Sequence, residues 1–297
     1  MIDILLLLMS VIWGTNYSIV KSAFRELDPQ AFNALRMMIA SAAFLTVIAL
    51  FQLRPASAGF AASIFRTPAR LTRRDVLELV ALGIVGHFFY QYFFIAGLAL
   101  TTVANSSLML AATPVVIALL SAVLGHERIS ARHWAGAALS MLGIYIVVGR
   151  GVDLAGHGLK GDLMMVAAVL CWALYTLGSR RLIARHSPVG VTGLSMTIGT
   201  LVYAPVMWGH VRAVPWSTIS TRTWIAIVYS SIFALGVAYT IWYAAVRQIG
   251  SARTSVYSNV IPLVAMATAV IFLGEPLTAT NVIGAIAVLV GVGLTRT

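Results

Sequence analysis

The stretch ILLLLMSVIWGTNYSIV (Ile4–Val20) decides the class of fold, because it is long and apolar enough to cross a membrane as a helix. An indole, an amide and a phenol lie near its middle, on Trp13, Asn16 and Tyr17. Lipid offers these groups no hydrogen-bond partner, so neighbouring helices or a bound molecule must supply one. We therefore predict that the segment faces a central cavity around which the other helices are arranged.

The composition of the whole chain indicates a membrane protein. Of its 297 residues, 60% are hydrophobic and 10% are charged, whereas soluble domains carry about 25% charged residues. The net charge of +11 comes from basic residues in short connections between apolar runs. We expect this charge to set membrane topology and not to bind nucleic acid. The single cysteine, Cys171, excludes an intramolecular disulfide.

Ten segments are long and apolar enough to span a membrane as helices. They cover residues 3–22, 29–52, 76–98, 101–124, 132–149, 162–182, 189–209, 223–246, 252–273 and 280–296. With the N-terminus in the cytoplasm, the inner connections hold thirteen Lys and Arg residues and the outer ones hold six. This bias favours cytoplasmic N- and C-termini. The longest connection, 53–75, is expected to be a topology-setting loop, with contact to anionic lipid as the alternative.

The chain contains an internal repeat, because matching residues recur at two fixed offsets. At an offset of 159 residues the pairs are Trp13 with Trp172, Lys21 with Arg180, Pro29 with Pro188, Leu35 with Leu194 and Met37 with Met196. At an offset of 148 residues they are Ala104 with Ala252, Ser107 with Ser255, Pro114 with Pro262, Glu127 with Glu275, Gly136 with Gly284 and Gly143 with Gly291. The difference between the offsets reflects the extra length of the connection 53–75 in the first copy.

Each copy holds five predicted spans, and since five is odd, the second copy must enter the membrane from the opposite side. The predicted fold is an all-α integral membrane protein with ten transmembrane helices, built as two inverted five-helix repeats around a central cavity. The first repeat is residues 1–150 and the second is residues 151–297. Inverted repeats are typical of secondary transporters, whose substrate site lies at the midplane between the repeats. The pattern therefore favours transport by alternating access.

Polar and aromatic side chains recur at helical spacing in several predicted spans. We predict that the following residues line the substrate cavity: Trp13, Asn16, Tyr17, His87, Tyr90, Gln91, Phe94, Asn105, Trp172, Tyr175, Tyr239, Trp242 and Tyr257. The alternative is that these side chains form interhelical hydrogen bonds and interfacial aromatic belts. For His87, a hydrogen bond to another helix is favoured over a role as proton carrier.

Prolines and glycines in the paired spans are expected to shape the helices around the cavity. Pro114 and Pro262 each free a backbone carbonyl in mid-span, so they are predicted to be hinges for gate opening or simple kinks. Glycines seven residues apart mark one close-packing face on the fifth and tenth spans, at Gly136, Gly143, Gly284 and Gly291. We predict that these two spans pack against each other, with a dimer interface as the alternative.

The near absence of charged groups from the predicted spans limits the class of substrate. No Asp or Glu lies in the middle of a predicted span, which argues against a tightly proton-coupled multidrug pump. Arg36 is the one Arg embedded in a predicted span. A strongly anionic substrate would need several cationic side chains, so we do not expect one. The expected ligand is small and neutral or zwitterionic, and an ammonium group could rest on a Trp or Tyr face. No enzyme or metal motif is recognisable, so we expect no catalytic residue, no metal and no cofactor.

The motifs, taken in order, resemble those of EamA-like transporters in the drug/metabolite transporter superfamily. Trp13 to Tyr17 followed by Ala34 to Met37 resembles the opening of the family's repeat, and Pro262 followed by Gly274-Glu275-Pro276 resembles its close. The resemblance implies ten helices, cytoplasmic termini and export of small metabolites across bacterial inner membranes. Within the family, amino-acid exporters of the YddG type are the most similar branch in size and aromatic lining.

The second half departs from the opening motif, because Trp172 is followed by Ala173-Leu174-Tyr175 and lacks the Gly and Asn. The two half-sites are therefore unlike, and we expect a substrate to bind asymmetrically. The predicted function is export of amino acids or similar small metabolites. Efflux of amphipathic drugs and a structural or receptor subunit without transport activity are the alternatives. The expected partners are the substrate and membrane lipid, and the expected state is a monomer.

Overall fold

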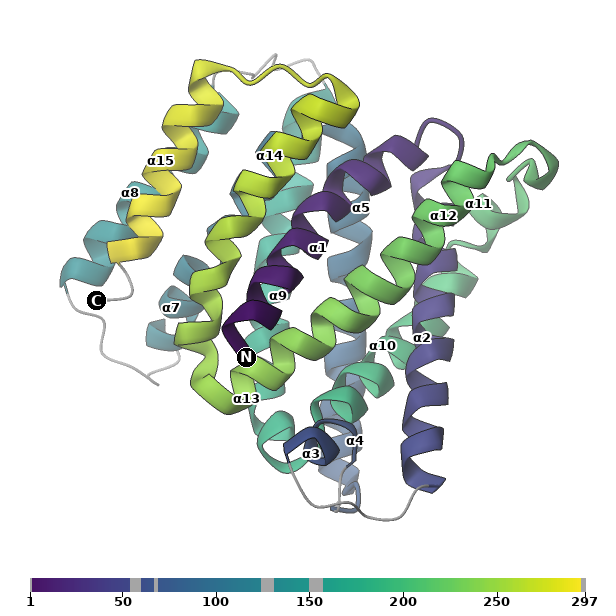
Figure 1. Cartoon of the computed structure of the whole chain (residues 1–297). Coiled ribbons are helices and arrows are strands. Elements are labelled where there is room, and N and C mark those ends of the chain that lie inside the picture. The colour runs from purple at the N-terminus through teal and green to yellow at the C-terminus, as the bar shows by residue number, and fades with distance from the viewer. Residues whose placement is uncertain (1, 54–59, 67–68, 124–130, 150–156, 295–297) are drawn as a thin grey trace.

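The computed structural model describes residues 2–53, 60–66, 69–123, 131–149 and 157–294, and within these ranges its regular structure is helical (Figure 1). The longer α-helices are α1 (Ile2–Ala23), α2 (Pro29–Leu53), α8 (Ala131–Gly149), α9 (His157–Arg185), α10 (Pro188–Val206), α13 (Ala238–Val256), α14 (Val260–Leu273) and α15 (Ala279–Leu294). The shorter ones are α3 (Phe60–Phe65), α4 (Arg73–Gly83), α5 (Tyr90–Leu100), α6 (Val103–Ala111), α7 (Thr113–Val123), α11 (Trp208–Arg212) and α12 (Thr221–Tyr229). The π-helical segments are η1 (Ile84–Phe89) and η3 (Ser230–Val237), and the 3₁₀ segments are η2 (Trp216–Thr218) and η4 (Tyr257–Asn259).

Several of these segments have the length and hydropathy of membrane spans. Within the described residues, six continuous helical segments qualify: Ile2–Ala23, Pro29–Leu53, Arg73–Leu100, Leu159–Arg185, Pro188–Val206 and Thr221–Ile249. Shorter apolar helices cover Val103–Ile117, Val260–Leu273 and Ala279–Gly291. The chain is therefore an all-α, multi-pass membrane protein, as the composition predicts. The count of ten spans and their inverted arrangement stay predictions.

The described helices often begin where a hydroxyl side chain can bind the free N–H groups of the first turn. The side chains of Thr72, Thr102, Ser187 and Ser220 each accept a hydrogen bond from the backbone N–H three residues further on. At α10, Pro188 directly follows its cap, where a missing N–H removes no intrahelical bond. These caps determine the residue at which α4, α6, α10 and α12 each begin.

Two predicted spans contain breaks at their prolines. The predicted span 101–124 is two helices, because α6 ends at Ala111 and α7 restarts at Thr113 with Pro114 directly after it. Pro262 likewise lies in the first turn of α14, just after η4. Proline is tolerated in a first turn because the N–H groups there have no intrahelical partner. Both prolines thus lie at helix breaks, and their role as hinges stays a prediction.

Other boundaries differ from the sequence-based ones. The predicted connection 247–253 is wrong, because α13 continues through it as helix to Val256. The predicted loop 53–75 contains the helix α3, and the ring of Phe65 at its end stacks on Phe51 of α2 with centroids 4.4 Å apart. The first residues of α4, from Arg73, also fall in this predicted loop. A polar break in the apolar pattern of the sequence does not by itself end a helix.

The two π-helical segments occupy equivalent positions in the two halves of the chain. Adding the repeat offset of 148 residues to η1 (Ile84–Phe89) gives residues 232–237, which lie within η3. A π-helix adds an extra residue to a turn and is often found at functional sites. Both segments lie in the middle of long apolar helices, between α4 and α5 and between α12 and α13.

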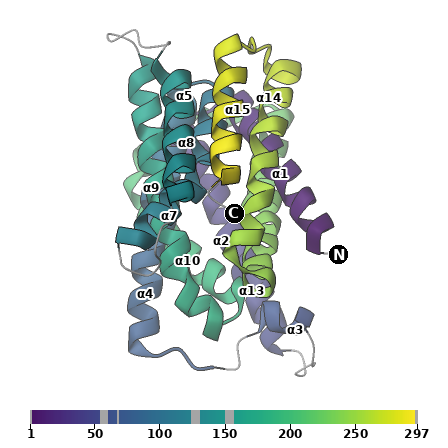
Figure 2. The same ribbon diagram turned by 90° about the vertical axis from the view of Figure 1, so that its left-hand side faces the viewer.

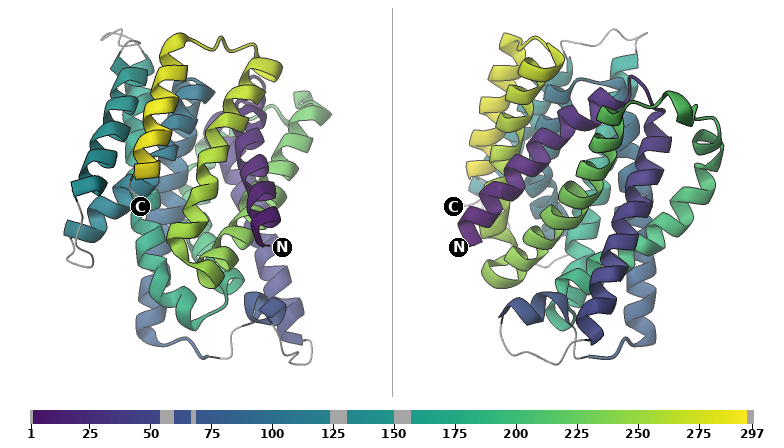
Figure 3. Two further views of the ribbon diagram at one scale, coloured as in Figure 1. Left: turned by 60° about the vertical axis from the view of Figure 1, so that its left-hand side comes forward. Right: turned by 45° about the vertical axis from the view of Figure 1, so that its right-hand side comes forward.

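The predicted packing of the fifth and tenth spans is confirmed, because α8 and α15 lie side by side at one side of the bundle (Figure 2). A Cβ atom on Gly143 would lie 2.9 Å from the carbonyl oxygen of Gly284. The helices can therefore approach this closely only because a glycine occupies the contact. Elsewhere α1 packs against α14, α2 against α10, and α5 against α9 (Figure 3).

Candidate functional site

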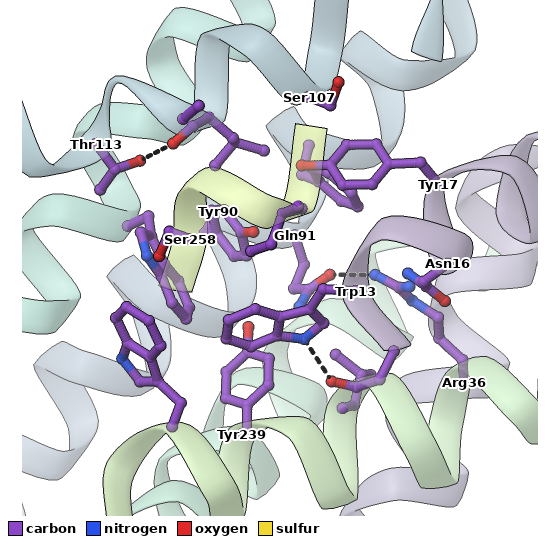
Figure 4. A pocket seen from close by; sticks show the side chains of 18 of the residues that line it. Trp13, Asn16, Tyr17, Arg36, Tyr90, Gln91, Ser107, Thr113, Tyr239 and Ser258 are labelled. Carbon is purple, nitrogen blue, oxygen red and sulfur yellow. Dashed lines mark hydrogen bonds between the residues drawn. The ribbon is translucent and has the colours of Figure 1, made fainter. Parts of the chain in front are cut away.

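A cavity with an empty volume of about 820 Å³, including the part open to solvent, lies among helices from both halves of the chain (Figure 4). Its lining is mostly apolar and aromatic, with a few polar side chains, as in small-molecule sites generally. The residues that line it are Trp13, Asn16, Tyr17, Arg36, Tyr90, Gln91, Phe94, Ser107, Leu110, Ala111, Thr113, Ile117, Trp172, Ala234, Leu235, Tyr239, Trp242, Ser258 and Ile261.

Trp13 of α1 contacts three aromatic rings that belong to the second half of the chain. Its ring centroid lies 6.0 Å from that of Trp172, 5.7 Å from that of Tyr239 and 5.6 Å from that of Trp242. Its indole N–H donates a 2.9 Å hydrogen bond to the carbonyl oxygen of Ala234 in η3. The π-helix therefore orients the indole, and the first half of the chain meets the second at this side chain.

The residue after Trp13 explains how α1 comes so close to α14. A Cβ atom on Gly14 would lie 2.5 Å from Cβ of Val264, a distance that real Cβ atoms do not reach. The next residue, Thr15, shares a 2.9 Å hydrogen bond with the hydroxyl of Tyr229 in α12. The motif Trp-Gly-Thr thus combines a cavity wall, a close helix contact and an interhelical hydrogen bond in three successive residues.

A second aromatic wall comes from α5 and α9. The ring of Tyr90 lies 5.1 Å from Trp172 and 5.8 Å from Phe94, measured between centroids. Phe94 in turn makes an edge contact with Tyr17 of α1 at 5.5 Å. Ring pairs at such distances contribute about 0.5–1.5 kcal/mol each beyond the area they bury. These contacts pack the rings of this wall against one another.

The charged group of the lining is the guanidinium of Arg36 on α2, and only 1% of this residue is exposed. Its Nε donates to Asn33 Oδ1 at 2.6 Å, Nη1 donates to Ser230 Oγ at 2.9 Å, and Nη2 donates to Gln91 Oε1 at 2.6 Å. Figure 4 shows the bond to Gln91 at the edge of the cavity. All three acceptors are neutral, so the guanidinium is oriented without being neutralised.

Two polar groups of the lining are buried with no hydrogen-bond partner among the described residues. They are Oδ1 of Asn16 and the indole Nε1 of Trp242. An unpartnered buried polar group is costly, at about 1–3 kcal/mol. Such groups in a cavity wall are therefore candidates for contact with a bound molecule.

The cavity brings together a large part of the residues predicted from the sequence. Those that line it are Trp13, Asn16, Tyr17, Tyr90, Gln91, Phe94, Trp172, Tyr239 and Trp242. They come from α1, α5, α9 and α13, which lie far apart in the chain. Their role in binding a substrate stays a prediction.

The other predicted residues lie outside this lining. His87 and Tyr175 form a layer behind it, with Nε2 of His87 3.1 Å from the Tyr175 hydroxyl, which is 3.2 Å from Oγ of Ser195. The hydrogen bond predicted for His87 to another helix is thereby confirmed. Asn105 accepts a 3.1 Å hydrogen bond from Asn281 of α15, and the Tyr257 hydroxyl donates at 2.5 Å to Asp3.

Some lining residues are absent from the predicted set, and Arg36 is the most important of them. The signal for it was available, because Arg36 follows Asn33 by one helical turn in an otherwise apolar span. The hydroxyl residues Ser107, Thr113 and Ser258 also line the cavity. Serine and threonine are common in membrane helices, where they bond to their own backbone, so their presence gives little indication of a site.

The end of the bundle near the α1–α2 connection is held together by polar contacts. Glu275, which follows α14, accepts a 2.9 Å hydrogen bond from the backbone N–H of Val103 at the start of α6 and lies 3.6 Å from Nζ of Lys21. Nearby, the hydroxyl of Thr101 donates to Asp162 of α9 at 2.7 Å. These bonds join α1, α6, α9 and α14 beyond this end of the cavity.

The lining extends toward the opposite end. Thr113 and Ile117 continue it along α7, and Ser258 and Ile261 continue it along η4 and the first turn of α14. This is the end of the bundle at which α13 joins α14 (Figure 1). The cavity is thus placed asymmetrically between the two ends of the bundle.

An apolar helix bundle with an aromatic cavity between its two halves is typical of membrane transporters for small molecules. The sequence model of the EamA-like transporter family matches residues 1–149 and 159–297. The chain belongs to this family and is a multi-pass membrane transporter.

Individual relatives are distant but cover the whole chain. The uncharacterized transporter YyaM of Bacillus subtilis is 26% identical over 98% of this chain and 92% of its own length. A Salmonella typhimurium protein named "Probable amino-acid metabolite efflux pump" is 25% identical over 97% of this chain and 92% of its own length. A solved structure described as "Crystal structure of protein" has a TM-score of 0.67 at 20% identity, covering 98% of this chain and 95% of that one. This last likeness concerns the fold alone.

Proposed function

We propose that the chain is a secondary transporter that exports small neutral or zwitterionic metabolites, most of all aromatic or neutral amino acids, across the bacterial inner membrane. The observation that carries the proposal is the cavity in which Trp13, Trp172 and Tyr239 contact one another across the two halves. An aromatic surface of this kind fits an apolar side chain, and its ring faces can also hold an ammonium group. Distant relatives named as amino-acid metabolite efflux pumps support the same substrate class.

Alternating access between two inverted five-helix repeats is part of the proposal. The family model matches the chain twice, and the two π-helical segments are related by the repeat offset. The polar contacts of Lys21 and Glu275 lie beyond one end of the cavity, and such contacts can open and re-form as the halves rock. The surplus of Lys and Arg in the connections on the opposite side supports an orientation in which that side and both termini face the cytoplasm.

Efflux of amphipathic cations is the rival proposal. Among the described lining residues, none is Asp or Glu, and the one charged group is the cationic Arg36. A positive charge in the wall opposes binding of an organic cation, whereas it tolerates a neutral molecule and favours a zwitterion oriented by its carboxylate. The charge of the cavity therefore supports the amino-acid proposal.

Counterflow in proteoliposomes distinguishes amino-acid export from efflux of amphipathic cations. Liposomes that contain the full-length protein are preloaded with unlabelled L-phenylalanine or with tetraphenylphosphonium, and uptake of the labelled form of each compound is followed. We expect phenylalanine to accumulate transiently and tetraphenylphosphonium to remain at the level of protein-free liposomes. Exchange of the cation without exchange of phenylalanine, leucine or methionine would overturn the proposal.

A further inference from the structure

Arg36 is a buried charge for which the described protein provides no counter-ion. Each hydrogen-bond acceptor around its guanidinium is a neutral amide or hydroxyl oxygen, from Asn33, Gln91 and Ser230. No described Asp or Glu forms an ion pair with it. Buried charges in proteins are normally paired, because an unpaired one loses its hydration without compensation. We therefore expect a bound anion to pair with this charge.

The guanidinium also has donors to spare. An arginine side chain carries five N–H groups, one on Nε and two on each terminal nitrogen. The bonds to Asn33, Ser230 and Gln91 use one N–H on each nitrogen. One N–H on Nη1 and one on Nη2 therefore have no acceptor in the described chain. A carboxylate has two oxygens, one for each of these two donors.

The three bonds that are made fix the plane of the guanidinium. Asn33 lies one turn earlier on α2 itself, Gln91 comes from α5, and Ser230 comes from the π-helix η3. Because these acceptors belong to three separate helical segments, the side chain is held at the junction of the two halves. A charged group that is fully oriented before a ligand arrives loses little conformational entropy on binding it.

We propose that Arg36 is the receptor for a carboxylate group of the substrate, which it binds through the two free N–H groups of Nη1 and Nη2. The inference rests on the proposed function and narrows it to substrates with a carboxylate. The unpartnered Oδ1 of Asn16, in the wall of the same cavity, accepts a hydrogen bond from the substrate's ammonium group. The rings of Trp13, Trp172 and Tyr239 hold the side chain of the amino acid.

Three probes with the same phenyl ring and different head groups test this assignment. L-Phenylalanine carries both head groups, 3-phenylpropionate lacks the ammonium and 2-phenylethylamine lacks the carboxylate. Binding to the full-length protein in detergent is measured by titration calorimetry. We expect phenylalanine to bind best and 3-phenylpropionate more weakly, and we expect 2-phenylethylamine to bind at least about 30-fold more weakly than phenylalanine, because it leaves the buried charge unpaired. Equal affinity for phenylalanine and 2-phenylethylamine would overturn the assignment of Arg36.

A variant that supplies its own carboxylate tests the charge directly. Gln91→Glu places a carboxylate where Gln91 Oε1 now accepts from Arg36 at 2.6 Å, so the guanidinium becomes neutralised from within the protein. The expected result is a melting temperature equal to or above that of the wild type, with affinity for phenylalanine and 3-phenylpropionate about 30-fold lower. Gln52→Glu, the same chemical change at the exposed end of α2, is the matched control and should leave both quantities unchanged.

The outcomes distinguish this inference from the proposed function. If Gln91→Glu retains wild-type affinity for both carboxylate probes while its fold is intact, the carboxylate receptor is elsewhere and the inference fails, although amino-acid export stands. If the wild-type protein binds 2-phenylethylamine but neither carboxylate probe, the inference fails together with the proposed substrate class. A loss of affinity in Gln91→Glu that is confined to the two carboxylate probes supports Arg36.

Discussion

At the residue scale, side chains with the same sequence spacing have different surroundings. His87, Tyr90, Gln91 and Phe94 follow the spacing of one helical face, yet only the last three line the cavity. The reason is the π-helix η1, which ends at Phe89 and shifts the register between His87 and the residues after it. A period of 3.6 residues assumes a regular α-helix, so the sequence alone could not exclude His87 from the lining.

Two hydroxyl deletions should separate the lining from the layer behind it. Tyr175→Phe removes hydrogen bonds to His87 and Ser195, and we expect it to lower the free energy of unfolding by about 1 kcal/mol with little change in ligand affinity. Tyr90→Phe removes a hydroxyl from a lining residue and should lower ligand affinity with little change in stability. Melting temperature and titration with L-phenylalanine measure the two effects. The reverse pattern would show that the two layers have been assigned wrongly.

At the scale of elements, glycine contacts and caps decide how closely the helices approach. The pairing of α8 with α15 was predictable, because glycines seven residues apart recur in both spans. The helix breaks before Pro114 and Pro262 were predictable only in part, because a proline in mid-span can either kink a continuous helix or end it. The continuation of α13 through residues 247–253 was not predictable, because arginines suit a helix end and a solvated helix turn equally well.

A substitution at Gly143 tests how closely α8 and α15 pack against each other. Gly143→Ala places a methyl group 2.9 Å from the Gly284 carbonyl oxygen, so we expect a loss of about 1–3 kcal/mol in stability from overpacking. Gly293→Ala on α15 is the matched control, because a Cβ atom there meets nothing within 4 Å. Thermal unfolding of both variants in the same detergent is the measurement. Equal melting temperatures for the two variants would contradict the close packing.

The connection between α1 and α2 is predicted to respond to pH. Glu26 accepts hydrogen bonds from the Ser220 backbone N–H, the Ser220 hydroxyl and the Thr223 hydroxyl at the start of α12. These bonds, led by the one from the Ser220 backbone, hold the pKa of Glu26 below its ordinary value of 4.5. Because the folded-state pKa is the lower one, the resulting stability is present above 4.5 and is lost as pH falls through the folded-state pKa.

Glu26→Gln removes this titration. We expect the melting temperature of the wild type to fall more steeply than that of the variant between about pH 5 and pH 3. At neutral pH the variant should be slightly less stable than the wild type, because an amide cannot accept all three hydrogen bonds as a carboxylate does. Parallel curves over the acidic range would show that the Glu26 contacts do not persist in solution.

At the scale of the whole molecule, composition and periodicity were sufficient for the class of fold. A chain with 60% hydrophobic residues in spans of membrane length has few alternatives to an α-helical membrane bundle. Most of the aromatic lining was also predictable, because Trp and Tyr in the middle of a span carry polar groups that lipid cannot hydrogen-bond. The hydrogen-bond partners of Arg36 were not predictable in full, because two of its three neutral acceptors lie on α5 and η3, far from Arg36 in the chain.

Counterflow with a matched pair of tryptophan variants tests the central claim that the Trp13 cavity carries the substrate. Trp13→Ala removes ring contacts to three neighbours, each worth about 0.5–1.5 kcal/mol, whereas Trp134→Ala removes an indole that is exposed on α8. Both variants are reconstituted at equal density, and exchange of labelled L-phenylalanine is measured. The account predicts a rate at least about tenfold lower for Trp13→Ala and a wild-type rate for Trp134→Ala. Equal exchange rates for Trp13→Ala and the wild type would contradict it.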